Sequence, residues 1–167
     1  MLDSNIFIMV ITGIAVLGLL FYVFKRPAKA PIEDKIVSGT GNALQLQAYE
    51  RLTLLVDRIT LSNLISRSSH EGLSARGMQF VLTKTIRDEF DYNITQQIYV
   101  TPEIWNAVKN LKEKNLLLIN QLTASLAPDA SGLDLNRALL DFLVKDNKTS
   151  QSELVSQALS YEAKKLL

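Results

Sequence analysis

Residues 101–126 read TPEIWNAVKNLKEKNLLLINQLTASL. Apolar residues recur in this stretch at every third or fourth position, which is the spacing of one face of an α-helix. Thr101, Pro102 and Glu103 predict the start of that helix, because threonine accepts hydrogen bonds from free N–H groups, proline fits the first helical position and glutamate favours the positive end of the helix dipole. We expect the helix to end before Pro128 and Gly132. The residues expected to face inward are Ile104, Val108, Leu111, Leu118, Ile119 and Leu122.

The same helical spacing continues on both sides of this stretch. Ser74 and the Ser150–Glu153 pair are predicted helix caps, and LSNLISR at 61–67 is a short helical turn. We therefore expect an all-α, helical-bundle-like domain of about five helices over residues 43–167. The apolar faces outside 101–126 consist of Tyr49, Leu52, Leu55, Val56 and Ile59; Met78, Val81, Leu82, Ile86 and Phe90; Leu135, Leu139, Leu140 and Leu143; and Leu154, Val155, Ala158, Leu159 and Tyr161.

Residues 91–100, DYNITQQIYV, interrupt this pattern. Their β-branched side chains are compatible with extended backbone. A partner strand is not evident elsewhere, and a lone strand is not stable. We expect the end of a helix followed by an ordered connection, and an extended segment is the alternative.

A second decisive stretch lies near the N-terminus. Residues Ile6 to Phe24 read IFIMVITGIAVLGLLFYVF and carry no charge. As a helix they would cover roughly 28 Å, close to the ~30 Å of a bilayer's hydrocarbon core. We expect residues 1–26 to be a transmembrane anchor that contacts lipid through residues 6–24, with Tyr22, Lys25 and Arg26 at the membrane interface.

The charged residues on either side of the anchor predict the orientation of the chain in the membrane. Lysine and arginine follow the apolar stretch, whereas Asp3 precedes it, so the positive-inside rule places the C-terminal domain in the cytoplasm and the N-terminus outside. This predicts a single-pass protein of the bacterial inner membrane. A cleaved signal peptide is the alternative, but it needs a positive N-terminal region and a shorter apolar stretch. Residues 27–42, with prolines and glycines, are expected to form an extended linker.

The amino-acid composition excludes several kinds of functional site. The chain has no cysteine, which excludes disulfides, thiolate metal sites and cysteine nucleophiles. Its formal net charge is +1, with 18 basic and 17 acidic residues. A nucleic-acid-binding domain usually carries a clear positive excess, so we expect no nucleic-acid partner.

Candidate catalytic residues are few. His70 is the only histidine, whereas a metal site normally needs several imidazoles, so we expect no metal and no cofactor. Asp88, Glu89 and Asp91 could act as paired carboxylates if buried. A charged outer helix face explains them better, with Arg87 and Asp91 paired at a spacing of four. We expect neither enzymatic activity nor a small-molecule substrate.

Two other polar patterns have structural interpretations. The stretch 129–136, DASGLDLN, has a faint similarity to a calcium loop, but its glycine stands in the wrong place and a turn with a helix cap explains it better. Asn115 falls in the apolar face of 101–126. A polar residue there can fix the register of packed helices, although such residues more often lie at the edge of the face beside water.

Gln97, Tyr99 and Trp105 are the candidate protein-contact residues. Tyrosine and tryptophan are frequent in binding hot spots, and these residues lie in or next to the irregular segment 91–100. The alternative is that Ile98, Val100 and Trp105 simply pack into the core of the domain.

Several short stretches carry a resemblance. They are AYERL at 48–52, DRI at 57–59, LISR at 64–67 and TIRDEFDYNITQQIYV at 85–100, followed by Trp105. With the N-terminal apolar stretch, they resemble an uncharacterised family of small single-pass bacterial membrane-anchored proteins. The resemblance implies this architecture and assigns no catalytic or binding residue.

These patterns favour a membrane-tethered, non-enzymatic interaction or scaffold protein on the cytoplasmic face of the inner membrane. Tethering raises the effective concentration of a domain near membrane partners. We expect a protein partner or self-association. An accessory or regulatory subunit of a membrane enzyme or transporter complex is the alternative, and an enzyme with a carboxylate or hydroxyl mechanism is a third hypothesis.

Overall fold

A computed structural model describes residues 32–69, 71–145 and 151–167 of the chain, with side chains from residue 40 onward. The predicted anchor at 6–24, its interface residues Tyr22, Lys25 and Arg26, and also His70 and Ser150 lie outside the described residues. Among the described helices, none combines the length and the apolar composition that crossing a bilayer requires.

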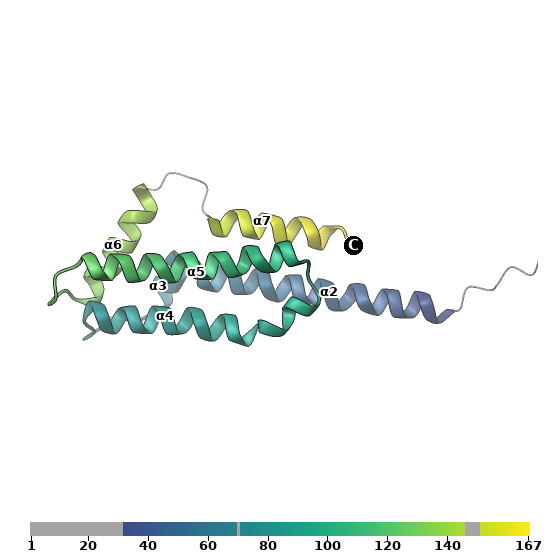
Figure 1. Cartoon of the computed structure of the whole chain (residues 1–167), viewed down its shortest axis with the longest axis horizontal. Coiled ribbons are helices and arrows are strands. Elements are labelled where there is room, and N and C mark those ends of the chain that lie inside the picture. The colour runs from purple at the N-terminus through teal and green to yellow at the C-terminus, as the bar shows by residue number, and fades with distance from the viewer. Residues whose placement is uncertain (1–31, 70, 146–150) are drawn as a thin grey trace, which may run out of the picture. The chain divides into compact units, whose positions relative to one another are not determined.

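The described residues form six α-helices and one short 3-10 helix (Figure 1). This confirms the all-α class, with the short turn at 61–67 counted as a helix of its own. The elements are α2 (Ile32–Ile59), α3 (Leu61–Arg67), α4 (Ala75–Tyr92), η1 (Ile94–Ile98), α5 (Pro102–Ser125), α6 (Gly132–Lys145) and α7 (Gln151–Lys164).

The expected extended linker over 27–42 is wrong in its second part, because residues 32–42 belong to α2. Gly39 and Gly41 each cost about 1 kcal/mol within a helix, but they do not end one as a proline would. The compact unit described below runs from Gly39 to Leu167.

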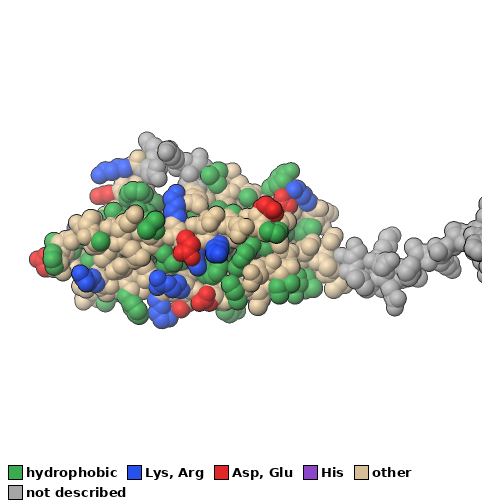
Figure 2. Space-filling view, viewed as in Figure 1, with side chains coloured by type: hydrophobic (Ala, Val, Ile, Leu, Met, Phe, Trp, Pro, Cys, Tyr) green, Lys and Arg blue, Asp and Glu red, His purple; other side chains and the backbone are tan. Residues whose placement is uncertain are grey.

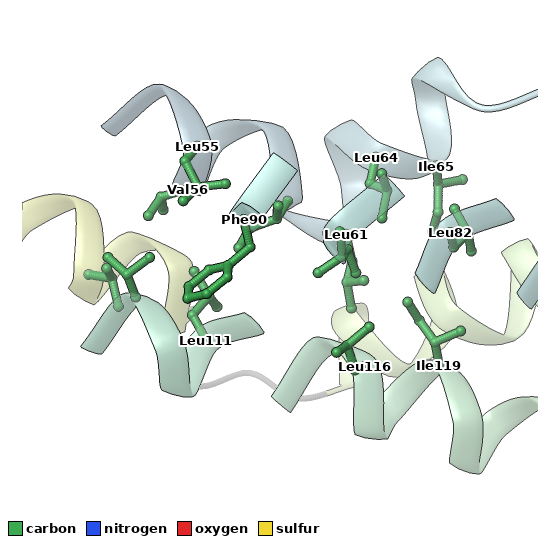
Figure 3. Packing of buried hydrophobic residues seen from close by; sticks show 14 of the residues in the cluster. Leu55, Val56, Leu61, Leu64, Ile65, Leu82, Phe90, Leu111, Leu116 and Ile119 are labelled. Carbon is green, nitrogen blue, oxygen red and sulfur yellow. The ribbon is translucent and has the colours of Figure 1, made fainter. Parts of the chain in front are cut away.

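One continuous apolar core joins the helices of this unit (Figure 3). α4 packs against both α5 and α6, and α5 also packs against α7. The fully buried side chains contributed by each helix include Leu52, Leu55, Val56 and Ile59 of α2, Leu64 of α3, Met78, Leu82 and Ile86 of α4, Ile119 of α5, Leu135 and Leu139 of α6, and Leu159 of α7.

Helix periodicity predicted most of this core and failed at a few positions. Leu116 is buried although the sequence did not place it on the inner face, because α5 packs against α4, α6 and α7 and its buried stripe is correspondingly wide. Leu140, Leu154 and Tyr161 were expected on apolar faces but are 40%, 52% and 65% exposed. Leu140 and Leu154 each lie next to a buried residue, at the margin of the buried face of their helix, and Tyr161 lies two residues beyond the fully buried Leu159.

The predicted helix starts are confirmed where they are described. The Ser74 hydroxyl accepts a hydrogen bond from the Gly77 N–H at 3.1 Å, and the Thr101 hydroxyl accepts one from the Ile104 N–H at 3.4 Å. Each bond satisfies one of the N–H groups that a helix leaves free in its first turn. Pro102 occupies the start of α5, as expected.

Asn115 holds the junction between α2 and α3. It is 7% exposed, and its side-chain Nδ2 donates to the Ile59 carbonyl at 2.8 Å. α2 ends at Ile59 without glycine or proline, so a carbonyl oxygen at its last residue needs another donor. Asn115 therefore lies inside the core and not at its solvent-exposed edge.

The starts of α4 and α6 are joined by two backbone hydrogen bonds. Ala75 N–H donates to the Ala130 carbonyl at 2.8 Å, and Gly132 N–H donates to the Leu73 carbonyl at 2.7 Å. A Cβ on Gly132 would lie 3.2 Å from both the Leu73 oxygen and the Met78 Cβ. Gly132 therefore begins α6 at a close approach, whereas the sequence had suggested that it ends the preceding helix.

Candidate protein-contact surface

The irregular segment 91–100 contains the last residues of α4, the short 3-10 helix η1 (Ile94–Ile98) and the turn that leads into α5. Asn93 stops α4: it is 5% exposed, and its Nδ2 donates to the Glu89 carbonyl at 2.9 Å. The Gln96 and Tyr99 N–H groups then donate to carbonyls three residues earlier, each at 3.0 Å. The extended alternative for this segment is therefore wrong, and the expected ordered connection is confirmed.

Aromatic packing fixes the base of η1. The rings of Phe90 and Trp105 lie 5.0 Å apart between centroids, with a tilt of 33°. The Lys112 Nζ lies 4.3 Å from the centre of the Phe90 ring, within cation–π range. Phe90 is 5% exposed, so α4 and α5 meet around it and hold both ends of the connection.

Apolar side chains on and beside η1 remain open to solvent. Tyr92 is 74% exposed, Ile98 72%, Ile94 40% and Tyr99 37%. These four residues are called the η1 surface below. Figure 2 shows hydrophobic side chains over the end of the domain where η1 joins α4 to α5. Exposed apolar residues are common singly, but a group of four with two tyrosines on one ordered turn fits a protein-contact surface.

The structure separates the three residues that sequence reasoning selected. Gln97 is exposed on η1 and Tyr99 directly after it, whereas Trp105 is partly buried one turn into α5 and packs against the core. Val100 also packs against the core. The alternative that these apolar residues fill the core therefore holds for Val100 and Trp105 and fails for Ile98.

Tyr92 and Ile94 complete the η1 surface, and sequence reasoning missed them. Tyr92 is the last residue of α4 and Ile94 the first of η1. The signal was present in the sequence, because both residues belong to the stretch in which the helical spacing fails. The sequence does not show which residues of this stretch are buried, so no pattern in it distinguished Tyr92 and Ile94 from core residues.

The carboxylates near the end of α4 do not form a paired acid–base site. The Glu89 carboxylate accepts hydrogen bonds at 3.2 Å from the Arg58 guanidinium of α2, and Asp88 forms an ion pair with Lys84. The expected Arg87–Asp91 pair is not found among the described ion pairs. Glu89 instead ties α4 to α2, at a partly buried position.

Asp134 and Ser131 explain the stretch that has a faint similarity to a calcium loop. The Asp134 Oδ2 accepts hydrogen bonds from the Ser131 hydroxyl at 2.7 Å and from its N–H at 2.9 Å. These bonds, the hydroxyl bond first, hold the pKa of the Asp134 carboxyl below its usual value of 3.8. The turn with a helix cap is thus confirmed, and no metal-binding cluster of acidic or histidine side chains occurs within the described ranges.

The chain belongs to a family of unknown function (DUF7935), whose model matches residues 3–166. The match covers almost the whole sequence, so the expected membership of an uncharacterised family is confirmed. No curated protein and no solved structure matches the chain.

Proposed function

We propose that this protein is a membrane-tethered, non-enzymatic helical domain that binds another protein at the cytoplasmic face of the bacterial inner membrane. The single observation that carries the binding role is the η1 surface, which leaves Tyr92 and Ile98 more than two-thirds exposed on an ordered turn. The tether is supported by the uncharged stretch 6–24 and the basic residues that follow it.

The η1 surface is not needed to complete the core. Phe90, Ile104 and Val108 are buried on either side of it and fill the space between α4 and α5. Burying a large apolar side chain fully contributes about 1.5–3 kcal/mol relative to leaving it in water. Tyr92 and Ile98 gain little of this burial free energy in the free domain. A partner that covered them would bury them, and the free energy of that burial would favour binding.

The tether and the η1 surface act together in this proposal. A surface of four apolar side chains is small for a tight complex, because specific interfaces usually bury on the order of 800 Å² on each partner. Confinement at the membrane raises the effective concentration of two anchored proteins and lets a modest interface suffice. We therefore expect a partner that is itself a membrane protein or is held at the membrane.

Site-specific photocrosslinking in native membranes tests the contact. A photoreactive phenylalanine analogue replaces Tyr92 in one full-length protein and Phe80 in a matched control. Phe80 is also an exposed aromatic residue of α4, 65% exposed, but lies twelve residues earlier, about 18 Å along the helix. We expect a discrete protein adduct from position 92 and none from position 80. Adducts from both positions, or from neither, would contradict a specific η1 contact.

Orientation and tether are tested separately. A reporter that is active only outside the cytoplasm, fused after Leu167, should stay silent; activity would overturn the cytoplasmic placement. Replacing residues 6–24 with an unrelated span should preserve the adduct at position 92. Loss of the adduct would point instead to a subunit whose span packs specifically against other spans.

A further inference from the structure

Helix α7 has two apolar faces, and the domain buries only one of them. Val155 and Leu159 are buried on the first face, where α7 packs against α5. Leu154, Ala158 and Tyr161 follow one another at spacings of four and three and form the second. These three residues are called the α7 face below. Leu154 and Tyr161 are more than half exposed, and Ala158 is partly buried at the border of the two faces. α7 lies at the outside of the bundle (Figure 1), so the α7 face is open to solvent.

The Tyr161 ring is held in place at one end of the α7 face. The Lys165 Nζ lies 4.3 Å from the centre of the ring, within cation–π range, and forms an ion pair with Glu162 at 2.6 Å. Tyr161 is therefore ordered although most of the residue faces solvent. A side chain that is already ordered loses little conformational entropy when a partner covers it, which favours it as a contact residue.

The α7 face is nearly symmetric about Ala158 and therefore fits a second copy of itself. In an antiparallel pair of α7 helices centred on Ala158, Leu154 of each copy lies level with Tyr161 of the other. The two spacings, four and three residues, differ by only about 1.5 Å along the helix. Each tyrosine ring then covers a leucine, and the small alanines at the centre let the two helices approach closely.

The charged residues beside the α7 face fit the same arrangement. Glu153 lies in the first turn of α7 and Lys164 in the last, and both are exposed. In the antiparallel pair, Glu153 of each copy lies level with Lys164 of the other, whereas a parallel pair would bring like charges to the same level. Among the described residues, Lys164 has no ion-pair partner, and the Glu153 carboxylate accepts only a 3.5 Å hydrogen bond from Gln157.

We propose that two copies of this chain associate through an antiparallel contact between their α7 helices. Such a pair has a two-fold axis, so the same face serves both copies. A contact between two helices of 14 residues is small beside an interface of roughly 800 Å² per partner, so the association is weak and depends on concentration. Anchoring both copies at a membrane would raise their effective concentration. The contact goes beyond the proposed function, because it uses residues that the η1 surface does not include.

A single introduced cysteine tests the contact, because the chain has no cysteine of its own. Ala158→Cys places a thiol at the centre of the pair, where the two copies come within disulfide distance. Ala124→Cys is the matched control, at a more exposed alanine of α5 outside the α7 face. Both full-length variants are expressed at equal levels in cells and treated with a membrane-permeant thiol oxidant. We expect at least tenfold more disulfide-linked dimer from position 158 than from position 124. No dimer from position 158, or equal yields from both positions, would overturn the proposal.

Charge reversal tests the direction of the pair. In the Ala158→Cys background, Glu153→Lys or Lys164→Glu brings like charges together, so either variant expressed alone should give at least threefold less dimer. When both variants are expressed together with different tags, the mixed pair has opposite charges at both ends, and its dimer yield should recover. Weakened folding of either variant would lower the mixed yield as well, so it cannot produce this recovery. No loss in the separate variants, or no recovery in the mixed pair, would overturn the antiparallel contact.

Discussion

Two buried asparagines show two different uses of the same side chain. At the junction of α2, α3 and α5, the Asn115 amide donates to the Ile59 carbonyl at 2.8 Å. On α6, the Asn136 amide has a buried oxygen without a hydrogen-bond partner. Both residues are less than 10% exposed. The first amide therefore contributes to folding, whereas the second costs stability, because its oxygen is buried without a hydrogen-bond partner.

The largest expected effect tests whether both regions belong to one cooperative core. Leu139 of α6 is fully buried, whereas the next residue, Leu140, is 40% exposed. Leu139→Ala should lower the free energy of unfolding by about 2–5 kcal/mol, because it removes buried methyl groups and leaves a cavity. Leu140→Ala is the matched control and should cost much less. Urea denaturation followed by circular dichroism measures both, and equal losses would show that α6 does not pack as described.

The next effect concerns the satisfied amide. Asn115→Ala should lower the free energy of unfolding by about 1–3 kcal/mol, since the Ile59 carbonyl then stays buried without a donor. Asn120→Ala is the control: Asn120 lies on the same helix and accepts a surface hydrogen bond from Gln79. A loss for Asn115→Ala no larger than that for Asn120→Ala would mean that water replaces the missing donor.

Substitution of Asn136, whose oxygen has no partner, should change stability in the opposite direction. Asn136→Leu is expected to raise the free energy of unfolding by about 1 kcal/mol, because it removes an unsatisfied buried oxygen and adds apolar contacts. Asn115→Leu, the same substitution at the satisfied amide, should destabilise the domain. If both substitutions change stability with the same sign, the distinction between the two asparagines fails.

The smallest effect is electrostatic and lies at the start of α6. Because the folded pKa of Asp134 lies below 3.8, its ionised form stabilises the domain above that pH. This contribution is lost as the pH falls through the lower folded pKa. Asp134→Asn should therefore lower the melting temperature at pH 7, and the difference from the unchanged protein should shrink as the solution is acidified. Asp141→Asn, an exposed carboxylate on the same helix, should not change the melting curve; a pH-independent difference for Asp134→Asn would contradict the capping role.

Much of the fold was predictable because it depends on local rules. The caps at Ser74 and Thr101 and the inner faces of α2, α4 and α5 follow from spacing and side-chain chemistry within a few residues. The prediction of an extended linker failed at residues 32–42, because glycines weaken a helix without ending it and no proline interrupts this stretch. The η1 surface was only half predictable: the sequence located the irregular segment, but it did not show which side chains face water.

The sequence by itself determined an all-α domain without cysteine chemistry, and an uncharged stretch at 6–24 that supports the proposed membrane tether. Periodicity, caps and composition are local properties, so the sequence states them directly. Only the tertiary structure decided that Asn115 meets the Ile59 carbonyl 56 residues away, that Ile98 is exposed while Val100 packs inward, and that Asn136 is buried without a partner. These outcomes depend on which helices become neighbours, and the energy of a buried polar group is set by what lies across from it.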